Sequence, residues 1–293
     1  MKQELSILIP IYGCKPHQLV KQLCEQANII SGLKDYEVVV VDDGTPDAAI
    51  VESCWAIGQW PHCRFMALEE NIGRSRIRNL LASLARFEWL LYLDCDMTID
   101  RQDFLANYLN CNEGDVVDGG VSIGPGDPGN LRWLYESTAA AEHSVAERKK
   151  RPYQDFHTAN FLVHRDIMKA HPFDTRFKHY GYEDVLFGKQ LNQAGIPIVH
   201  IDNPAGFYTF EDNARFVAKT EEGLRTLREF RNELRGYSRL LTLAEGIHLA
   251  PVRWMLRLYF RLCAPLMRRN LCGTRPSLSL FRLYKIGYYL NLQ

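Results

Sequence analysis

The sequence predicts an α/β protein built on a doubly wound, mainly parallel sheet with helices on its faces. Short apolar runs that suit buried strands alternate with segments of helical periodicity over the first two hundred residues. Polar residues follow directly where three of these runs end, as at the ligand-binding edge of such sheets. The length of 293 residues, with 46% hydrophobic and 24% charged residues, suits one large globular domain or two smaller ones.

The first hundred residues supply four strand candidates. An apolar run at 5–9 is closed by Pro10, and residues 38–41 are four consecutive valines, as expected of a strand buried on both faces. Helical periodicity between these two strands completes a β-α-β unit. The elements expected in this part are strands at 5–9, 37–41, 64–68 and 89–93, and helices at 16–27 and 74–86.

The pattern loosens beyond residue 96. Gly and Pro are frequent in the stretch 119–130, which predicts a loop. The elements expected after it are a long helix at 131–149, a strand at 160–163, a helix at 183–194 that Gly195 ends, and a strand at 196–201. From residue 213 onward the periodicity is mostly helical, which predicts a helical extension at 211–293.

The charges are balanced in number but not in position. The 35 Lys and Arg residues equal the 35 Asp and Glu residues, and a net charge of zero argues against a protein that binds nucleic acid. Residues 1–245, however, hold 27 basic and 35 acidic residues, a net charge of −8. Residues 246–293 hold eight basic and no acidic residues, a net charge of +8, so this segment is expected to differ in role from the rest.

The N-terminus and the cysteines both favour a cytoplasmic protein. The sequence begins without a signal-peptide pattern, and no uncharged run reaches the ~18–20 residues that a membrane span needs. The eight cysteines are scattered without a CxxC pair, which predicts reduced thiols and argues against a structural zinc site.

Asp94 and Asp96 directly follow the apolar strand candidate at 89–93. Two carboxylates at alternating positions can point to the same side of a turn, where they repel each other unless a divalent cation lies between them and a substrate. The pair is therefore a candidate site for Mn²⁺ or Mg²⁺. The alternative is a surface triplet without a ligand, because Asp-x-Asp is common in proteins.

The remaining carboxylate motifs each have two interpretations. Asp43 belongs to an Asp-Asp-Gly-Thr segment after the second strand, and such a segment also suits a plain strand-to-helix turn capped by Thr45 or Asp47. Glu183 and Asp184 open a helix, where the helix dipole alone favours acidic residues. In the functional interpretation, this acidic pair supplies a general base that takes a proton from a sugar hydroxyl, worth ~10²–10⁴ in rate.

Taken together, the motifs resemble those of family 2 glycosyltransferases. The resemblance covers roughly residues 4–210 and rests on five segments in the family's order and spacing, namely 6–12, 37–45, 71–79, 91–96 and 181–184. It implies a GT-A fold, a nucleotide-sugar donor for which a UDP-sugar is expected, and an inverting transfer to an acceptor hydroxyl. The implied organisation is a catalytic domain at 1–210, with a nucleotide-sugar-binding half at 1–115 and an acceptor-binding half at 116–210, followed by the helical extension.

The resemblance also implies roles for residues of the donor site. Pro10 and Tyr12 would contact the donor, with Tyr12 stacked on its nucleobase. Asp43 would accept a hydrogen bond from the base, and Arg78 would lie near the base or the phosphates. The donor-site roles end with the Asp-x-Asp pair, in which Asp94 would hold the ribose or sugar and Asp96 would ligate the metal that bridges the diphosphate.

On the acceptor side, the resemblance implies Asp184 as the base, with Glu183 beside it orienting the acceptor or sugar. Tyr182 and Asn160 are candidate acceptor contacts. The sequence departs from the family in one place, because segment 205–208 lacks the histidine that relatives often use as a further metal ligand. His200 lies on an apolar strand candidate and is interpreted as a hydrogen-bonded core residue instead.

The C-terminal segment has an amphipathic pattern of its own. Arg253, Arg257 and Arg261 recur every four residues beside a broad apolar surface. Residues 251–293 are thus a candidate for peripheral contact with an anionic membrane at its inner face, and the alternative is a helix packed on the catalytic domain with solvated arginines.

The leading functional hypothesis is a glycosyltransferase of surface polysaccharide or glycolipid biosynthesis that acts on a glycan or lipid-linked glycan acceptor. One alternative is a non-catalytic nucleotide-sugar-binding protein, motivated by the missing histidine. The other is a sugar nucleotidyltransferase, which should carry a glycine-rich, lysine-bearing loop after the first strand. Segment 12–16 has a single Gly and matches that loop poorly.

Overall fold

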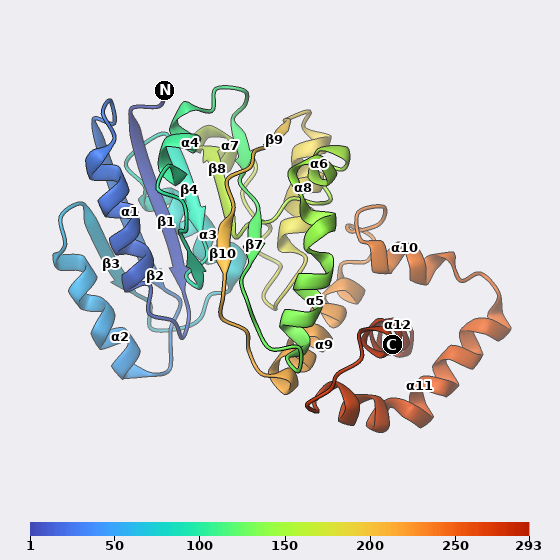
Figure 1. Ribbon diagram of the computed structural model, residues 1–293. Helices are drawn as coiled ribbons and strands as arrows, with labels where there is room; N and C mark the ends of the chain where they lie inside the picture. Colours follow the sequence, from blue (N-terminus) through green and yellow to red (C-terminus); the bar gives the residue numbers. More distant parts are fainter. Residues whose placement is uncertain (293) are drawn as a thin grey trace.

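The computed structural model describes residues 1–292 and confirms the mixed, mainly parallel α/β architecture (Figure 1). The main sheet consists, in spatial order, of β3 (Cys63–Ala67), β2 (Asp35–Asp42), β1 (Glu4–Ile11), β4 (Trp89–Leu93), β8 (Asn160–His164), β6 (Val116–Asp118) and β9 (Ile198–His200). Strands β1 to β4 are parallel, and β8 runs antiparallel to both β4 and β6. A small second sheet has the order β5 (Met97–Thr98), β10 (Ala205–Phe207), β7 (Val121–Ile123).

Helices cover both faces of the main sheet and form a separate group at the C-terminus. They are α1 (His17–Ile29), α2 (Ala48–Cys54), α3 (Arg74–Leu84), α4 (Phe104–Asn110), α5 (Leu131–Ala139), α6 (Val145–Lys150), α7 (Arg165–Ala170), α8 (Glu183–Gln193), α9 (Asn213–Glu229), α10 (Arg239–Gly246), α11 (Ala250–Leu271) and α12 (Leu278–Asn291). Short 3₁₀ turns follow α2 at Trp55–Gln59 and α5 at Ala140–His143. In Figure 1, α10 to α12 lie on the side opposite β3.

The alternating strand residues divide the core into two layers. Val38 and Val40 of β2 face the layer that α1 and α4 cover, whereas Val39 and Val41 face the layer that α3, α7 and α8 cover. In this second layer, the rings of Tyr92 and Phe161 stack at 4.8 Å between centroids. A strand whose side chains are buried on both faces must be apolar throughout, which explains the unbroken valine run.

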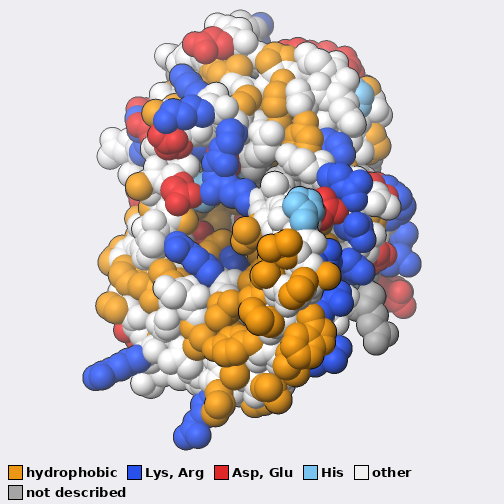
Figure 2. All heavy atoms as spheres, turned by 90° about the vertical axis from the view of Figure 1, so that its right-hand side faces the viewer, with side chains coloured by type: hydrophobic (Ala, Val, Ile, Leu, Met, Phe, Trp, Pro, Cys, Tyr) orange, Lys and Arg blue, Asp and Glu red, His pale blue; other side chains and the backbone are white. Residues whose placement is uncertain are grey.

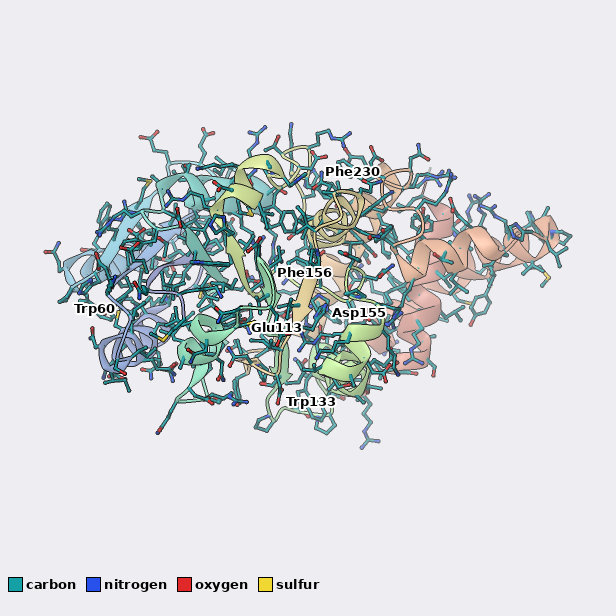
Figure 3. All side chains as sticks on the ribbon, turned by 90° about the horizontal axis from the view of Figure 1, so that it is seen from above. Trp60, Glu113, Trp133, Asp155, Phe156 and Phe230 are labelled. Carbon is teal, nitrogen blue, oxygen red and sulfur yellow. The ribbon has the colours of Figure 1, made fainter. Side chains whose placement is uncertain are left out.

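The C-terminal helices have an apolar core of their own, which extends to residues beside the main sheet. Phe177 and Leu186 belong to the same cluster as residues of α9, α10 and α12. Figure 3 shows Phe230 at this junction, beside the layer that contains Phe156 and far from Trp60 at the other end of the molecule. The outer surface of the group is broadly apolar, with Lys and Arg side chains along its edges (Figure 2). The boundary proposed at residue 210 falls in the link between β10 and α9.

Three local predictions from the sequence were wrong. The helix expected at 131–149 is broken into α5, a 3₁₀ turn and α6, and Arg148 of α6 forms an ion pair with the buried Asp118. The stretch 119–130 is not all loop, since β7 pairs with β10 there. The strand expected at 196–201 is only Ile198–His200, because the amide of Ile196 still bonds the end of α8 and Pro197 has no N–H to offer a neighbouring strand.

Candidate active site

The ends of β1 and β2 bring Tyr12 and Asp43 to the same edge of the sheet. Pro10 pairs with Val41 in the parallel register, and Tyr12 directly follows β1 with its side chain exposed. Asp43 is buried, and its two carboxylate oxygens accept the backbone N–H groups of Ile72 and Gly73 at 2.7 and 3.1 Å. Burial raises the pKa of Asp43, and these two hydrogen bonds oppose the rise. Asp43 thereby fixes the segment that leads into α3.

The segment after Asp43 confirms the turn interpretation of this motif as well. Asp47 caps α2 and accepts the N–H of Ala49 at 3.0 Å. Gly44 has φ +71° and lies against the backbone of Glu70 and Asn71, where a Cβ would meet atoms at 2.5 Å. The glycine is therefore required both by backbone conformation and by close approach.

Arg78 connects two of the predicted acidic motifs. Its side chain, only 2% exposed, rises from α3 and donates from Nη2 to Asp94 Oδ1 at 2.8 Å. Its Nη1 lies 3.5 Å from Oε1 of Glu183 at the start of α8, and Nη1 of Arg74 lies 3.6 Å from the same oxygen. A buried carboxylate held by two guanidinium groups cannot move freely, so Glu183 ties α8 to α3.

Asp94 and Asp96 lie in the turn between β4 and β5, as their position after a strand predicts. The backbone N–H of Asp94 bonds Ala159 of the segment before β8, which fixes the turn. Desolvation in the cleft, followed by the charge of Asp94, raises the pKa of Asp96, and the more distant cations of Arg74 and Lys219 lower it in part. Within residues 1–292, Asp96 forms no ion pair, so its charge is the less compensated of the two.

The start of α8 places the acidic pair with the help of an unusual backbone. Gly181 and Tyr182 both have positive φ, +97° and +69°, and Tyr182 occupies the left-handed region that a bulky residue rarely adopts. From this turn, Glu183 contacts Arg74 and Arg78, and Asp184 lies beside His157. Backbone strain of this kind commonly occurs at functional sites, where surrounding packing maintains it.

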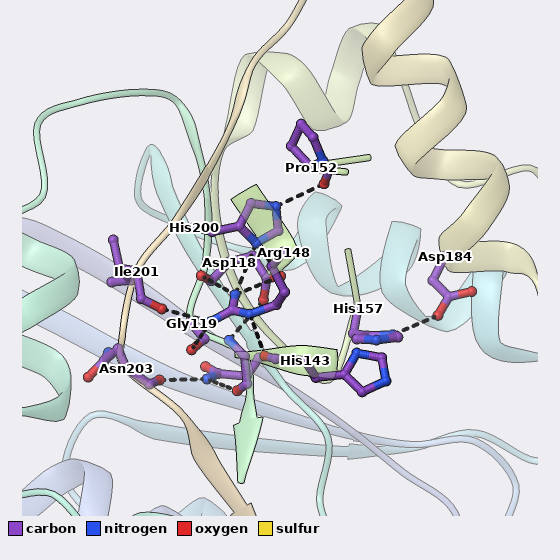
Figure 4. A network of polar contacts seen from close by, with 12 residues as sticks. Asp118, Gly119, His143, Arg148, Pro152, His157, Asp184, His200, Ile201 and Asn203 are labelled. Atoms are coloured by element: carbon purple, nitrogen blue, oxygen red, sulfur yellow. Dashed lines mark hydrogen bonds and ion pairs between the residues drawn. The ribbon is translucent and has the colours of Figure 1, made fainter. Parts of the chain in front are cut away.

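His157 is a partner of Asp184 that the sequence did not indicate. Its Nδ1 lies 3.7 Å from Asp184 Oδ2, and the side chains are 40% and 25% exposed (Figure 4). Burial opposes the charge of each group, but the mutual attraction outweighs it and raises the pKa of His157 while lowering that of Asp184. The proximity of His157 thus favours the ionised form of Asp184. No periodic pattern surrounds His157, so only the folded chain brings the two together.

A buried polar network supports the floor of the site (Figure 4). Arg148 Nη1 lies 3.1 Å from Asp118 Oδ2 and 3.0 Å from His200 Nδ1, and His200 Nε2 lies 2.9 Å from the carbonyl oxygen of Pro152. A carbonyl oxygen can only accept, so Nε2 of His200 carries a proton, while Nδ1 lies 3.0 Å from both Arg148 Nη1 and Asp118 Oδ2. Both ring nitrogens are therefore engaged, which confirms His200 as a hydrogen-bonded core residue.

Asn160 belongs to this floor and lies outside the cleft. Its Oδ1 accepts the hydroxyl of Tyr108 at 2.7 Å, and its Nδ2 donates to the carbonyl oxygens of Gly120 and Asn203 at 2.8 and 2.9 Å. The side chain is buried, and all of these partners come from the chain itself. In this structure Asn160 holds strand ends together and has no surface facing the cavity.

A cavity of ≈ 450 Å³ joins the acidic motifs. Of the predicted site residues, it is lined by Asp94, Asp96, Tyr182, Glu183 and Asp184, whereas Pro10, Tyr12, Asp43, Arg78 and Asn160 are not part of its lining. Cations that the sequence did not single out complete it, namely Arg74 of α3, Arg132 of α5, Lys219 of α9 and Lys285 of α12. One cavity therefore has carboxylates on two walls and cations between them, which suits an anionic ligand and a base.

The donor atoms at Asp94 and Asp96 fit a hard divalent cation. Carboxylate oxygens are the ligands that Mg²⁺ and Mn²⁺ prefer, and Asp96 has no ion-pair partner within residues 1–292. Within residues 1–292, no group of three or more His, Cys, Asp or Glu side chains is arranged to hold a metal ion. The remaining ligands of a bound ion would therefore come from substrate phosphates and water, which is the usual arrangement for Mg²⁺.

Solved structures with the same fold are glycosyltransferases. A mannosyltransferase from Pyrobaculum calidifontis, PcManGT, in complex with GDP-Man and Mn²⁺ aligns with a TM-score of 0.56 and 16% identity, over 99% of this chain and 85% of that one. TarS 1-349 from S. aureus in complex with UDP-GlcNAc aligns with a TM-score of 0.53 and 18% identity, over 99% and 90%. A search of curated protein sequences gives no match.

The sequence itself carries the family assignment. The family described as glycosyl transferase family 2 matches residues 6–171, which is more than half of the chain and includes the strand-end motifs. The fold that the chain shares with TarS and PcManGT, at 20% and 16% identity, agrees with this family assignment. The chain therefore belongs to glycosyl transferase family 2 and is a glycosyltransferase with a GT-A fold.

Proposed function

We propose that this glycosyltransferase transfers a sugar from a nucleotide-sugar donor, a UDP-sugar, to an acceptor hydroxyl with inversion at the anomeric carbon. The observation that carries the proposal is the single cavity with Asp94 and Asp96 on one wall and Asp184 on another. A donor diphosphate carries the negative charge that the cations of this cavity suit, and a nucleotide sugar is bound in the related structures of PcManGT and TarS.

In this mechanism, Asp184 is the general base. It is ionised, it lies on the cavity wall, and it can accept the proton of the acceptor hydroxyl as the hydroxyl oxygen attacks the anomeric carbon. The bond from that carbon to the diphosphate breaks as the new bond forms, so one displacement inverts the configuration. Tyr182 lines the cavity directly before the acidic pair and is proposed as an acceptor contact.

Glu183 and Arg78 act as positioning residues in this proposal. Their buried contact links α8 to Asp94 through α3, so it sets the distance between the base and the donor wall. Asn160 is also proposed as a positioning residue, because its buried hydrogen bonds hold together the strand ends below the cavity. Tyr12 and Asp43, at the neighbouring strand ends, are proposed to contact the nucleobase, because they lie at the carboxyl edge of the same parallel strands.

Asp96, with Asp94, would hold Mn²⁺ or Mg²⁺, and such an ion would supply positive charge to the departing diphosphate. Lys219 and Lys285 contribute further positive charge from the C-terminal helices. Family membership favours transfer over the nucleotidyltransferase and the non-catalytic alternatives. We propose that the acceptor is a glycan or a lipid-linked glycan, and that the product is part of a surface polysaccharide or glycolipid.

The direct test is release of nucleoside diphosphate from a panel of nucleotide sugars, each offered with and without glycan and glycolipid acceptors and with Mn²⁺. We expect one donor to give acceptor-dependent release that EDTA abolishes. A nuclear magnetic resonance spectrum of the product separates inversion from retention. Release of pyrophosphate from a nucleoside triphosphate and a sugar 1-phosphate, without transfer from any nucleotide sugar, would contradict the proposal.

A further inference from the structure

Helix α11 has one face that packs and another that the chain leaves uncovered. Phe260, Met267 and Leu271 are buried against the neighbouring helices, and the Phe260 and Tyr284 rings lie 5.3 Å apart in an edge-on contact with α12. These three residues recur at intervals of seven and four, which is the spacing of one helical face. They form the buried face by which α11 packs on the rest of the protein.

The opposite face is apolar and exposed over the length of the helix (Figure 2). Leu262, Leu266 and Trp254 are 70%, 68% and 63% exposed. Val252, Met255, Leu258 and Tyr259 are exposed on the same helix, and Leu249 extends the surface at its start. Single exposed apolar residues are ordinary on protein surfaces, but a contiguous set of this length marks an interaction surface.

Arginines line one edge of this apolar face and retain their charge. The Nε of Arg257 donates to the carbonyl oxygen of Leu290 at 2.7 Å, and the Nε of Arg261 donates to Asn291 Oδ1 at 3.0 Å. Both contacts fix the side chains without neutralising them. Arg268 differs, because it pairs with Glu221. Arg257 and Arg261 form no ion pair within residues 1–292, so their positive charge is available to a partner of this surface.

These features fit a lipid surface better than a second copy of the chain. A dimer formed through α11 would cover the apolar residues, but each copy would present arginines and no carboxylate from this segment. An anionic membrane offers both an apolar phase and phosphate groups at its surface. No helix within residues 1–292 is long and apolar enough to cross a bilayer, so α11 would lie in the plane of the interface.

We propose that α11 docks on an anionic membrane, with its apolar face inserted below the lipid headgroups and Arg257 and Arg261, beside that face, on the headgroup phosphates. The docked helix packs on α12, and α12 contributes Phe281 and Lys285 to the active-site cavity. In the docked state, only α12 therefore separates the cavity from the membrane-bound helix α11. An acceptor whose lipid anchor remains in the membrane could present its glycan there.

The test is sedimentation of the full-length protein with vesicles of phosphatidylcholine alone and of phosphatidylcholine with phosphatidylglycerol, each at low and high salt. We expect binding to the anionic vesicles that high salt weakens. Leu262→Glu combined with Leu266→Glu should reduce this binding more than ~10-fold, because each change removes a large apolar side chain from the interface. Ile29→Glu, at an equally exposed apolar position of α1, is the matched control and should bind like the parent.

Two results would overturn the proposal. One is that the parent protein binds neither kind of vesicle at low salt. The other is that the double variant binds as well as the parent. Sedimentation velocity distinguishes the competing explanation, since a parent dimer that the double variant converts to monomer, without vesicle binding, would assign the face to self-association. Quenching of Trp254 by bromolipids, lost in Trp254→Phe, should locate the docked helix.

This inference is independent of the proposed chemistry, and the two fail in different ways. A docking failure leaves release of nucleoside diphosphate to a short water-soluble acceptor unchanged. Failure of the proposed function would remove that release but leave vesicle binding intact. The double variant should retain the parent's rate with a soluble acceptor, because its two positions face away from the cavity lining.

Discussion

The two acidic walls of the cavity carry their charge in different ways. On the α8 wall, Asp184 is paired with His157 and Glu183 with two arginines, so both carboxylates are compensated before any ligand arrives. On the β4 wall, desolvation and Asp94 raise the pKa of Asp96, which forms no ion pair within residues 1–292. In the proposed mechanism, the α8 wall supplies the base and the β4 wall receives the cation.

Removing the base should give the largest loss of activity. Asp184→Asn keeps the shape of the side chain but cannot accept the acceptor proton, so we expect a rate reduced by ~10²–10⁴ with little change in donor affinity. Initial rates of nucleoside diphosphate release measure it. Asp166→Asn, at an exposed position on α7, is the matched control. Equal rates for Asp184→Asn and the parent would assign the base elsewhere.

A change on the β4 wall should weaken binding of the donor and metal as well as lower the rate. Asp96→Asn removes one of the two proposed metal ligands, and we expect roughly 10²-fold lower kcat/KM and loss of the donor-induced rise in Tm that Mn²⁺ supports. Without donor and metal, the variant should unfold at the parent's Tm or slightly above it, because a poorly compensated charge is gone. A metal-dependent rise in Tm equal to that of the parent would contradict the metal assignment.

A variant of Arg78 tests whether the β4 wall and the α8 wall of the cavity depend on each other. Arg78→Met leaves Glu183 and Asp94 without this buried partner, and we expect a loss of about 3–5 kcal/mol in the free energy of unfolding. Chemical denaturation measures it. Arg86→Met is the control, since Arg86 forms an exposed pair with Asp35 that contributes at most about 1 kcal/mol. Similar losses for both variants would show that the buried link does not organise the site.

The smallest effect concerns the pH dependence. His157 lowers the pKa of Asp184, so His157→Gln should raise that pKa and shift the acidic limb of the rate profile to higher pH. The base is active when ionised, so the variant loses activity first on the acidic side. An unchanged acidic limb would show that His157 does not tune the base.

The same pair makes a signed contribution to stability. Asp184 contributes above its unfolded-state pKa and loses this contribution as pH falls through its lowered folded-state pKa. His157 contributes below its unfolded-state pKa and loses its contribution as pH rises through its raised folded-state pKa. The difference in Tm between the parent and His157→Gln should therefore be greatest in mildly acidic solution, between these two limits.

The sequence determined the parts of this protein that local pattern encodes. The valine run of β2 and the carboxylates placed directly after β4 depend only on neighbours along the chain, so the sheet and the positions of Asp94 and Asp96 were predictable. The break in the helix expected at 131–149 was not, because local periodicity carries no information about contacts such as that of Arg148 in α6 with Asp118, 30 residues away.

Only the tertiary structure decided how the site is assembled. Arg78 meets Glu183 across 105 residues, and His157 meets Asp184 from a loop without periodicity, so neither contact has a signature in sequence. The apolar residues of α11 were visible in the sequence, but periodicity gave equal support to packing and to docking. The fold settled which side is used for packing, because burial depends on what the rest of the chain brings alongside, and it left the other side of α11 uncovered.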